Sequence, residues 1–428
     1  MGSNGTVAHA PSAVAPTASA SSFDAAGTLN ALREASQEDG GGDGLPFESG
    51  AGDAAAIRDA APHVLADLAA DHAASVRAQN TDVAEDTSTS FVDDTDAFQA
   101  AYDAARARQA QGDPAVPYLL EDATGGLGAR DGGRGFGVEI EFDLPGTYSQ
   151  QLDALDAIGR DLHDAGLTQS PRMFGYHEGR GGGGYSDSPD RWRLESDSTV
   201  AGEIVSPIMY DEPQTWQNLA TVCDVVRRHG GRATARTGGH VHVSAGDYDH
   251  TVGNHHRLLS MVSDNEDTLY RLAQNPARPA HRGLTWCRPN SVPAQGYTSL
   301  RNVREENSSH YVGVNMQSLN GRNSDHVEFR MWDGSLDPGV IQTQVKVSLG
   351  LTDAAFRGRG TPQPGTAEPV GTHRAYNART GNEGRLTGEA WRDNTHSFRR
   401  LADALFRRDQ DKAQATALFA VTRWQRAR

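Results

Sequence analysis

Three short stretches of the chain place two ionisable side chains on either side of one apolar residue. They are EIE at 139–141, HVH at 240–242 and EFR at 328–330. Side chains alternate between the two faces of a strand, so each stretch would present its ionisable groups on one face. Carboxylates about 6.6 Å apart on one face repel unless a cation or water separates them. The three stretches therefore predict a sheet face suited to cations and phosphate.

A fourth stretch, WRLESDSTVAGEIVSP at 192–207, adds further acidic residues. These are Glu195, Asp197 and Glu203. Glu203 stands between a glycine and two apolar residues, and a carboxylate in such a setting needs a partner. Elsewhere, Gly238 and Gly239 directly precede His240. Two glycines at this point predict that the backbone approaches another group closely.

If these groups converge, the site offers several carboxylate oxygens and one or two imidazole nitrogens. Oxygen-rich ligation suits Mg²⁺ or Mn²⁺ and disfavours a zinc tetrahedron. There are more carboxylates than one ion needs, which suggests two or three ions of the kind that hold nucleotide phosphates. The alternative is a solvent-exposed sheet face that binds no ligand, because half-buried antiparallel strands often alternate charged and apolar residues. The choice of Glu, His and Arg favours the metal site.

The stretches fall on predicted strands that are separated by amphipathic helices. Strands are predicted at GVEIEFD, RWRLESD, AGEIVSP, RATARTGGHVHVSAG and HVEFRMW. Helices are predicted over SQQLDALDAIGRDLHDAG, over DEPQTWQNLATVCDVVRRHGG, over 254–274 and from Asp337–Pro338 onward. These helices would cover the apolar face of the sheet and leave the other face to the ionisable groups.

Composition excludes several classes of protein. A net charge of −16 argues against a nucleic-acid binder. Lys346 and Lys412 are the only lysines, so the chain contains no P-loop motif. Cys223 and Cys287 are too few for a disulfide framework or a thiolate zinc site. No secretory signal and no apolar run of about 18 residues is found, so we expect a cytoplasmic protein without a membrane partner.

The domain organisation follows from shifts in composition. Residues 1–130 are of low complexity and are expected to be mostly disordered, with helical stretches such as DAFQAAYDAARARQAQ. This arm suggests a contact with a protein partner or peptide substrate. The glycine-rich TGGLGARDGGRG at 124–135 is predicted to be a linker. The catalytic domain is predicted at 131–356, a second linker at 357–391 and a terminal helix at 392–428.

The order of the motifs resembles the bacterial amidoligase family. The motifs are G-V-E-I-E-F, W-R-L-E-S-D-S with A-G-E-I-V-S-P, T-G-G-H-V-H-V-S, and H-V-E-F-R with a following G-S-L-D. The resemblance covers about residues 135–355. It implies an ATP-dependent carboxylate–amine ligase similar to glutamine synthetase and glutamate–cysteine ligase. The implied fold is α+β, a glutamine synthetase-like domain with a curved, largely antiparallel sheet and helices packed on one face.

The resemblance also implies roles for individual residues. The implied metal ligands are Glu139, Glu141, Asp197, Glu203, His240 and Glu328. The two glutamates of the first strand would bind different ions, and His240 is preferred to His242 as the imidazole ligand. Glu195 lies eight residues before Glu203, as in glutamine synthetase, whereas Asp197 fits the amidoligase D-S pattern better and is preferred. Arg330 would hold phosphate or a substrate carboxylate.

The implied mechanism has two steps. A substrate carboxylate attacks the γ-phosphate of ATP to give an acyl phosphate, and an amine then displaces phosphate to form an amide. Glu328, Arg330 and Arg301 are the implied catalytic residues, and Arg330 and Arg304 would contact ATP. Arg301 and Arg304 lie in YTSLRNVR at 297–304, where solvated arginines are the alternative. The substrates would be a small-molecule or peptide carboxylate and an amine.

Two other classes of function are left open. A metal-dependent hydrolase would use His240, His242 and a glutamate, and would need neither ATP nor several acidic ligands. A non-catalytic binding protein would keep the fold without turnover. The retained Glu, His and Arg set argues against the loss of activity.

Overall fold

The computed structural model describes residues 88–120, 123–176, 178, 191–248, 252–273, 287–293, 296–319, 325–358, 385–386, 388–422 and 425–426. All of them belong to a unit that spans Ala60–Arg428. The predictions for residues 1–87 and for most of the linker at 357–391 lie outside the described residues.

An antiparallel sheet forms the centre of the fold. Among the described residues, its strands are β1 Phe136–Phe142, β2 Arg193–Glu195, β3 Gly202–Val205, β4 Gly238–Ser244, β5 Val314–Asn315 and β6 His326–Asp333. They pair in the order β2-β3-β1-β4-β6-β5, which places β1 and β4 in the middle. A separate parallel pair joins β7 Arg385–Leu386 to β8 Gln425–Arg426. The predicted α+β class with an antiparallel sheet is therefore confirmed.

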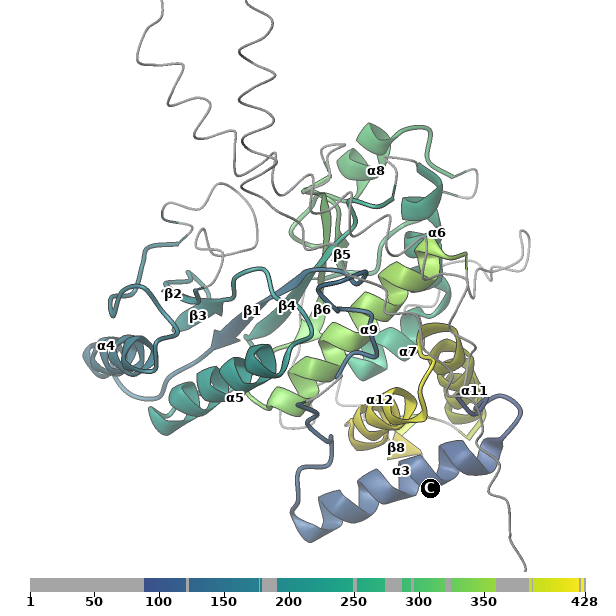
Figure 1. Ribbon diagram of the computed structural model, residues 1–428, viewed down its shortest axis with the longest axis horizontal. Coiled ribbons are helices and arrows are strands. Elements are labelled where there is room, and N and C mark those ends of the chain that lie inside the picture. The colour runs from purple at the N-terminus through teal and green to yellow at the C-terminus, as the bar shows by residue number, and fades with distance from the viewer. Residues whose placement is uncertain are drawn as a thin grey trace, which may run out of the picture. The chain divides into compact units, whose positions relative to one another are not determined.

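Helices α4, α5 and α9 lie on one side of the sheet (Figure 1). The helices between and after the strands are α4 Tyr148–Asp164, α5 Pro213–Arg228, α6 Val252–Asp264, α7 Glu266–Leu272, α8 Leu300–Glu306 and α9 Pro338–Phe356. Trp216 of α5 stacks on Phe136 of β1 with ring centroids 5.5 Å apart. Trp332 of β6 donates its indole N–H to Ser348 of α9 at 3.1 Å. These contacts bury the apolar face and leave the opposite face to the polar residues.

Two predicted long helices are each interrupted. The predicted helix at 254–274 consists of α6 and α7, which meet at Asn265. The predicted terminal helix consists of α11 Gly388–Leu405 and α12 Asp409–Val421, because Arg408 adopts an extended conformation between them. Helix α11 also begins inside the stretch predicted to be a linker. Within the described part of the chain, no helix combines the length and apolar composition needed to cross a bilayer.

The N-terminal part of the described chain packs against the C-terminal helices. The predicted helical stretch near residue 100 is confirmed as α3 Thr95–Gln111, which contacts α12. Phe98 of α3 lies 6.0 Å from Phe398 and 6.4 Å from Phe419, measured between ring centroids. Aromatic burial of this kind anchors α3 to α11 and α12.

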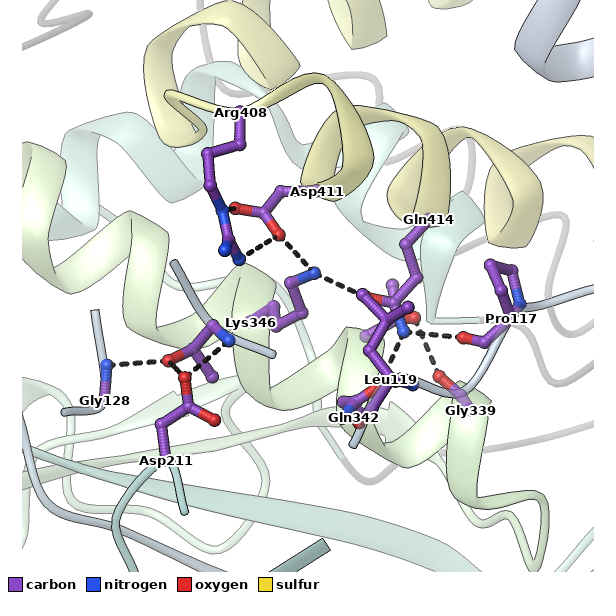
Figure 2. Close-up of polar contacts among 12 residues, drawn as sticks. Pro117, Leu119, Gly128, Asp211, Gly339, Gln342, Lys346, Arg408, Asp411 and Gln414 are labelled. Carbon is purple, nitrogen blue, oxygen red and sulfur yellow. Dashed lines mark hydrogen bonds and ion pairs between the residues drawn. The ribbon is translucent and has the colours of Figure 1, made fainter. Parts of the chain in front are cut away.

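Helix α9 is buried on both sides because α12 covers the side that faces away from the sheet (Figure 2). Lys346 Nζ of α9 lies 2.5 Å from Asp411 Oδ1 and 2.5 Å from Gln414 Oε1 of α12. Gln342 of α9 accepts a hydrogen bond from the Leu119 N–H at 2.9 Å and donates to the Leu119 carbonyl at 2.5 Å. We call this set the helix network. It consists of Gln342, Lys346, Arg408, Asp411 and Gln414.

The glycine-rich stretch at 124–135 is not a linker, contrary to the sequence-based prediction. Thr124 is fully buried, and its N–H and hydroxyl bond to Asp211 at 2.7 and 2.5 Å. Gly125 has φ +65°, and a Cβ there would lie 2.7 Å from both Arg408 Nε and Asp411 Oδ2. Glycine at this position therefore permits a close approach to the helix network.

Candidate metal centre

A row of three carboxylates crosses the polar face of the sheet. Glu203 of β3 lies directly opposite Glu141 of β1 and also opposite Glu195 of β2. Residues that are directly opposite in antiparallel strands point to the same face, with Cβ atoms about 4.5–5.5 Å apart. Three like charges at this spacing destabilise the sheet unless positive groups lie among them.

The neighbouring positions place imidazoles beside carboxylates on the same face. Glu139 of β1 lies opposite His240 of β4, and His242 of β4 lies opposite Glu328 of β6. The alternation predicted for EIE, HVH and EFR therefore holds, and the pairing of the strands brings the three stretches side by side. Convergence of these stretches is the geometry that the metal-site interpretation requires.

A β-bulge in β6 follows the EFR stretch, so that Arg330 stays on the polar face by alternation while Trp332 returns to the helical side. Arg330 and Met331 both lie opposite the single residue His240. The extra residue lets Phe329 and Trp332, which are three positions apart, both pack on the helical side. The Arg330 guanidinium then pairs with the carboxylate two residues before it in the same strand. A simple alternation of residues along β6 does not predict this bulge.

The imidazole of His240 lies at the centre of these groups. Its Nδ1 lies 2.7 Å from Glu139 Oε2 and 3.6 Å from Glu328 Oε1. Its Nε2 lies 3.7 Å from Glu141 Oε1. The two ring nitrogens thus face different carboxylates.

Two groups of three potential ligands share His240 in the described part of the chain. One group is Glu139, His240 and Glu328, and the other is Glu141, Glu203 and His240. In each group the ligand atoms all lie within 4.8 Å of one another. We call these residues, together with Arg330, the sheet-face cluster. It consists of Glu139, Glu141, Glu203, His240, Glu328 and Arg330.

The backbone of Gly238 also contributes to the cluster. Its N–H donates to Glu141 Oε2 at 2.6 Å. A Cβ at this position would lie 3.3 Å from His240 Nε2 and 3.4 Å from Glu141 Oε1. The close approach predicted from the paired glycines is therefore confirmed, and it holds the Glu141 carboxylate in place.

The charges of the cluster shift the pKa values of its members in opposite directions. Burial would raise the pKa of Glu139, but hydrogen bonds with His240 and His242 hold it well below its usual range. Burial would likewise raise the pKa of Glu328, but the positive charge of Arg330 lowers it. Burial raises the pKa of Glu141, and the nearby charge of Asp197 acts in the same direction. Of these three carboxylates, Glu141 is the one whose pKa is raised.

The donor set fits Mg²⁺ or Mn²⁺. The two groups together offer four carboxylates and the one imidazole that they share, a set rich in hard oxygen ligands. Opposed ligands of an octahedral Mg²⁺ lie about 4.2 Å apart, so the observed spacing needs little adjustment to hold an ion. A cation in each group would also offset the repulsion within the carboxylate row.

The remaining candidate ligands lie near the cluster but outside the two groups. Glu195 is fully buried and pairs with Arg193, with Nε 2.8 Å from Oε1. Asp197 Oδ1 accepts hydrogen bonds from the Thr199 N–H and hydroxyl, each at 2.6 Å. His242 Nε2 lies 3.6 Å from Glu139 Oε1. The choice between Glu195 and Asp197 as a ligand therefore stays a prediction.

The predicted arginines of α8 are placed differently. Arg301 is 86% exposed and pairs with Glu305 one helical turn away. Arg304 is also exposed on α8. Neither residue is a member of the sheet-face cluster. The Arg301 side chain is therefore solvated in this structure, and the roles of Arg301 in catalysis and of Arg304 in ATP binding stay predictions.

Two residues beside the cluster were not singled out from the sequence. Arg193 lies two positions before Glu195 on the same strand, so strand alternation alone is a signal for its position. Tyr176 is half exposed, and burial together with the charges of Glu203 and Asp197 raises its pKa. These charges act on the Tyr176 hydroxyl because it lies near the acidic end of the face. A single tyrosine before a glycine-rich loop gives no such signal in the sequence.

The fold and the cluster define an α+β protein with a candidate metal centre on the open face of an antiparallel sheet. A family model described as "Putative amidoligase enzyme" matches residues 132–352, about half of the chain. The chain therefore belongs to this amidoligase family, which supports a ligase-type activity. No match is found among curated proteins. The matched range contains β1–β6 and the whole sheet-face cluster, whereas α3, α11 and α12 lie outside it.

Proposed function

We propose that this protein is an ATP-dependent ligase that joins a carboxylate to an amine at a site for two divalent cations, Mg²⁺ or Mn²⁺. The observation that carries the proposal is the pair of carboxylate-rich groups that share His240, next to Arg330, in a member of an amidoligase family. The arrangement resembles what a glutamine synthetase-like mechanism needs. A cytoplasmic location stays a prediction from the sequence.

The cluster residues would hold the cations in two positions. Glu139 and Glu328 belong to one, Glu141 and Glu203 to the other, and His240 lies between them. An imidazole that donates Nδ1–H to Glu139 keeps Nε2 available for a cation beside Glu141. The pKa of His240 is raised, because the carboxylates of Glu139 and Glu328 outweigh burial and the charge of Arg330. Cation binding at Nε2 would therefore release a proton. Bound cations would supply charge neutralisation and alignment for the phosphates of ATP.

Arg330 would orient the reacting groups from the other side. It is 16% exposed, and Glu328 fixes its guanidinium against the polar face. A guanidinium held in this way can bind phosphate or carboxylate oxygens with two parallel hydrogen bonds. In the proposed reaction a substrate carboxylate oxygen attacks the γ-phosphorus, and ADP leaves. The amine nitrogen then attacks the acyl carbon, loses a proton and expels phosphate.

The geometry favours the ligase over the hydrolase alternative. A zinc hydrolase would require His240 and His242 to bind one ion together. In the described residues each three-residue group contains one histidine, and His242 belongs to neither group. A donor set dominated by carboxylates is suited to phosphate-bound Mg²⁺ more than to zinc.

The test begins with nucleotide binding and needs no knowledge of the substrates. We expect a non-hydrolysable ATP analogue to raise the melting temperature of the full chain when Mn²⁺ is present and to have little effect in its absence. Anomalous diffraction from a crystal soaked with the same pair should place Mn²⁺ beside His240. Absence of any Mn²⁺-dependent stabilisation by nucleotide would contradict the proposal.

Turnover is tested with a pool of carboxylates and amines. Wild-type protein should release ADP with Mg²⁺, and hydroxylamine should trap an acyl phosphate as a hydroxamate. Glu328→Ala should lose ADP release while its circular dichroism spectrum stays unchanged. Full turnover in Glu328→Ala would show that Glu328 is not part of the site.

A further inference from the structure

The peptide that joins Thr237 to Gly238 is held by hydrogen bonds at both ends. The Gly238 N–H donates to Glu141 Oε2 at 2.6 Å. The Thr237 carbonyl oxygen accepts a hydrogen bond from the Gly334 N–H at 3.0 Å. The N–H and the C=O of a trans peptide lie in one plane and point in opposite directions. The contact at the carbonyl therefore fixes the direction in which the Gly238 N–H points.

Close packing of Gly334 keeps this peptide in place. Gly334 directly follows β6, and a Cβ there would lie 2.6 Å from Thr237 Oγ1 and 2.9 Å from the Gly238 carbonyl oxygen. A larger residue at this position would push the peptide away from β6. The same strand carries Glu328 and Arg330. The strand that supplies two residues of the sheet-face cluster therefore also positions the Gly238 N–H.

Side-chain hydrogen bonds support the peptide from the side of β1. Thr237 is fully buried, and its hydroxyl accepts from the Thr234 N–H at 3.0 Å and donates to the Thr234 carbonyl at 3.1 Å. The Thr234 hydroxyl donates to Asp143 Oδ2 at 2.5 Å. Asp143 is buried and directly follows β1, two positions after Glu141. Strand β1 therefore anchors the segment that orients its own glutamate.

This arrangement gives the two oxygens of Glu141 different partners. Oε2 accepts the hydrogen bond from Gly238, whereas Oε1 lies 3.7 Å from His240 Nε2. A Cβ at position 238 would lie 3.3 Å from that nitrogen and 3.4 Å from Oε1, so glycine keeps the space beside both atoms open. Hydrogen bonds to the outer atoms of a metal ligand set its orientation and tune its affinity. Oε1 is thus the Glu141 oxygen directed toward the imidazole.

We infer that the Thr237–Gly238 peptide makes Glu141 a one-oxygen ligand, through Oε1, of the cation that Glu141 shares with Glu203 and His240. This inference rests on the proposed function, because it assumes that this group of three residues binds a cation. Thr237 and Gly334 are positioning residues, which act on the cation through the peptide and the Glu141 carboxylate. Their replacement should weaken this cation and spare the one in the group of Glu139 and Glu328.

The inference is tested by titrating the full chain with Mn²⁺ in the absence of nucleotide, using the electron paramagnetic resonance signal of free Mn²⁺. Wild-type protein should bind two ions. Gly334→Ala should bind one ion with wild-type affinity and the other about tenfold more weakly, because Glu141 loses the hydrogen bond that orients it. A purely structural role would lower the stability to urea and leave both affinities unchanged. That result would overturn the inference.

Gly253→Ala provides a matched control. Gly253 lies in α6, and a Cβ there would meet Arg257 Nη1 at 3.6 Å, an ordinary van der Waals contact. Neither Gly253 nor Gly334 has a positive φ, so both substitutions add a methyl group without backbone strain. Gly253→Ala should bind both ions with wild-type affinity. Equal weakening of one ion in both variants would show that the effect does not come from the Thr237–Gly238 peptide, and would overturn the inference.

A second pair of variants keeps the test decisive if Gly334→Ala fails to fold. Thr237→Val removes the hydroxyl that bonds to Thr234 and should weaken the same ion about threefold. Thr237→Ser keeps the hydroxyl and should bind both ions as wild type does. Wild-type affinities in Thr237→Val, or equal weakening in Thr237→Val and Thr237→Ser, would overturn the inference.

A crystal of the full chain soaked with Mn²⁺ tests the ligand atom directly. Glu141 should contact the ion through Oε1, with Oε2 still bonded to the Gly238 N–H. An ion held by both oxygens of Glu141 would overturn the inference. If wild-type protein binds no Mn²⁺, the proposed metal site itself fails, and this inference fails with it. If wild-type protein binds two ions and every variant binds them equally well, only the positioning role of the peptide fails.

Discussion

The sheet-face cluster and the helix network are both buried and both rich in charge, but they differ in how the charge is matched. In the helix network, Asp411 accepts contacts from Lys346 and Arg408, and Gln414 completes the shell of Lys346 (Figure 2). In the sheet-face cluster, four glutamates surround one histidine and one arginine.

This difference separates a structural use of buried charge from a binding use. A buried ion pair that is closed by protein groups joins segments of the chain, and removal of one partner leaves an uncompensated charge. In a cluster with more carboxylates than positive groups, the carboxylates repel one another. A bound cation relieves this repulsion, which favours binding. Mutations should therefore have opposite effects on stability in the two regions.

The largest expected effect is in the helix network. Asp411→Asn should lower the free energy of unfolding by about 3–5 kcal/mol, because Lys346 and Arg408 would lose their shared carboxylate. Mn²⁺ binding should be unchanged. Urea unfolding of the metal-free protein measures the first effect, and electron paramagnetic resonance measures the second.

Asp409→Asn is the matched control for this substitution. Asp409 lies in the first turn of the same helix but is exposed, where it accepts a hydrogen bond from the Thr89 N–H at 2.7 Å. Asp409→Asn should lower the free energy of unfolding by about 1 kcal/mol or less. Equal destabilisation by both substitutions would show that burial of the Lys346–Asp411 pair has no special importance.

The opposite effect is expected for Glu141 in the sheet-face cluster. Glu141→Gln should lower Mg²⁺-dependent ADP release about a hundredfold, or about 2.7 kcal/mol in transition-state free energy. The metal-free variant should nevertheless be more stable than wild type at pH 7. Burial raises the pKa of Glu141, so the folded state disfavours its ionised form. The side-chain amide oxygen can still accept the hydrogen bond from Gly238.

The effect of Glu141 on the stability of the metal-free protein should depend on pH. A carboxyl group whose pKa is raised on folding makes the folded state bind more protons, so its cost grows as pH rises through the usual range of glutamate. The stability difference between Glu141→Gln and wild type should therefore be larger at pH 7 than at pH 4. A variant less stable than wild type at pH 7 would contradict the idea of surplus charge in the cluster.

Local pattern is sufficient to predict the faces of the strands but not their partners. The alternation around Glu139, His240 and Glu328 predicts which side chains share a face, because it depends only on strand geometry. The bulge at Arg330 depends on the pairing of β6 with β4, which sequence spacing does not encode. The helix network is missed because its partners are distant in the chain, as for Lys346 and Asp411.

Glycine-rich sequence is the least reliable guide. Glycine indicates flexibility when nothing surrounds it, but it also permits close contacts that any Cβ would block. The composition of 124–135 predicts flexibility, whereas Thr124 is anchored to Asp211 and Gly125 approaches Asp411. The predicted terminal helix is too long because no glycine or proline marks the break between α11 and α12 at Arg408.

Gly125→Ala tests whether this close approach matters to the helix network. The substitution should lower the free energy of unfolding by about 2 kcal/mol. Alanine is strained in a left-handed conformation, and its Cβ would displace Arg408 and Asp411. Gly112→Ala is the control, because Gly112 has φ +81° but no heavy atom lies within 4 Å of the point that a Cβ would occupy. It should cost about 1 kcal/mol. Equal costs in urea unfolding would mean that the contact with the network contributes nothing.

The smallest expected effect concerns Asp403, which joins α11 to the segment before α3. Its carboxylate lies 2.6 Å from Lys412 Nζ and accepts hydrogen bonds from the N–H groups of Phe91 and Val92. Burial would raise the pKa of Asp403, but these partners lower it below its usual value of 3.8. The stabilisation is therefore present above pH 3.8 and is lost as pH falls through the lowered pKa.

Asp403→Asn should consequently reduce stability at pH 7 by about 1–2 kcal/mol, because the buried Lys412 loses its carboxylate but keeps the Thr89 carbonyl as a hydrogen-bond acceptor. The difference from wild type should narrow in urea unfolding as the pH falls below about 3.8. Asp93→Asn, in the exposed part of the same segment, controls for the loss of one negative charge. If the stability difference between Asp403→Asn and wild type widened toward low pH, the folded state would favour protonated Asp403. Asp403 would then behave like Glu141 and not like the ion pairs of the helix network.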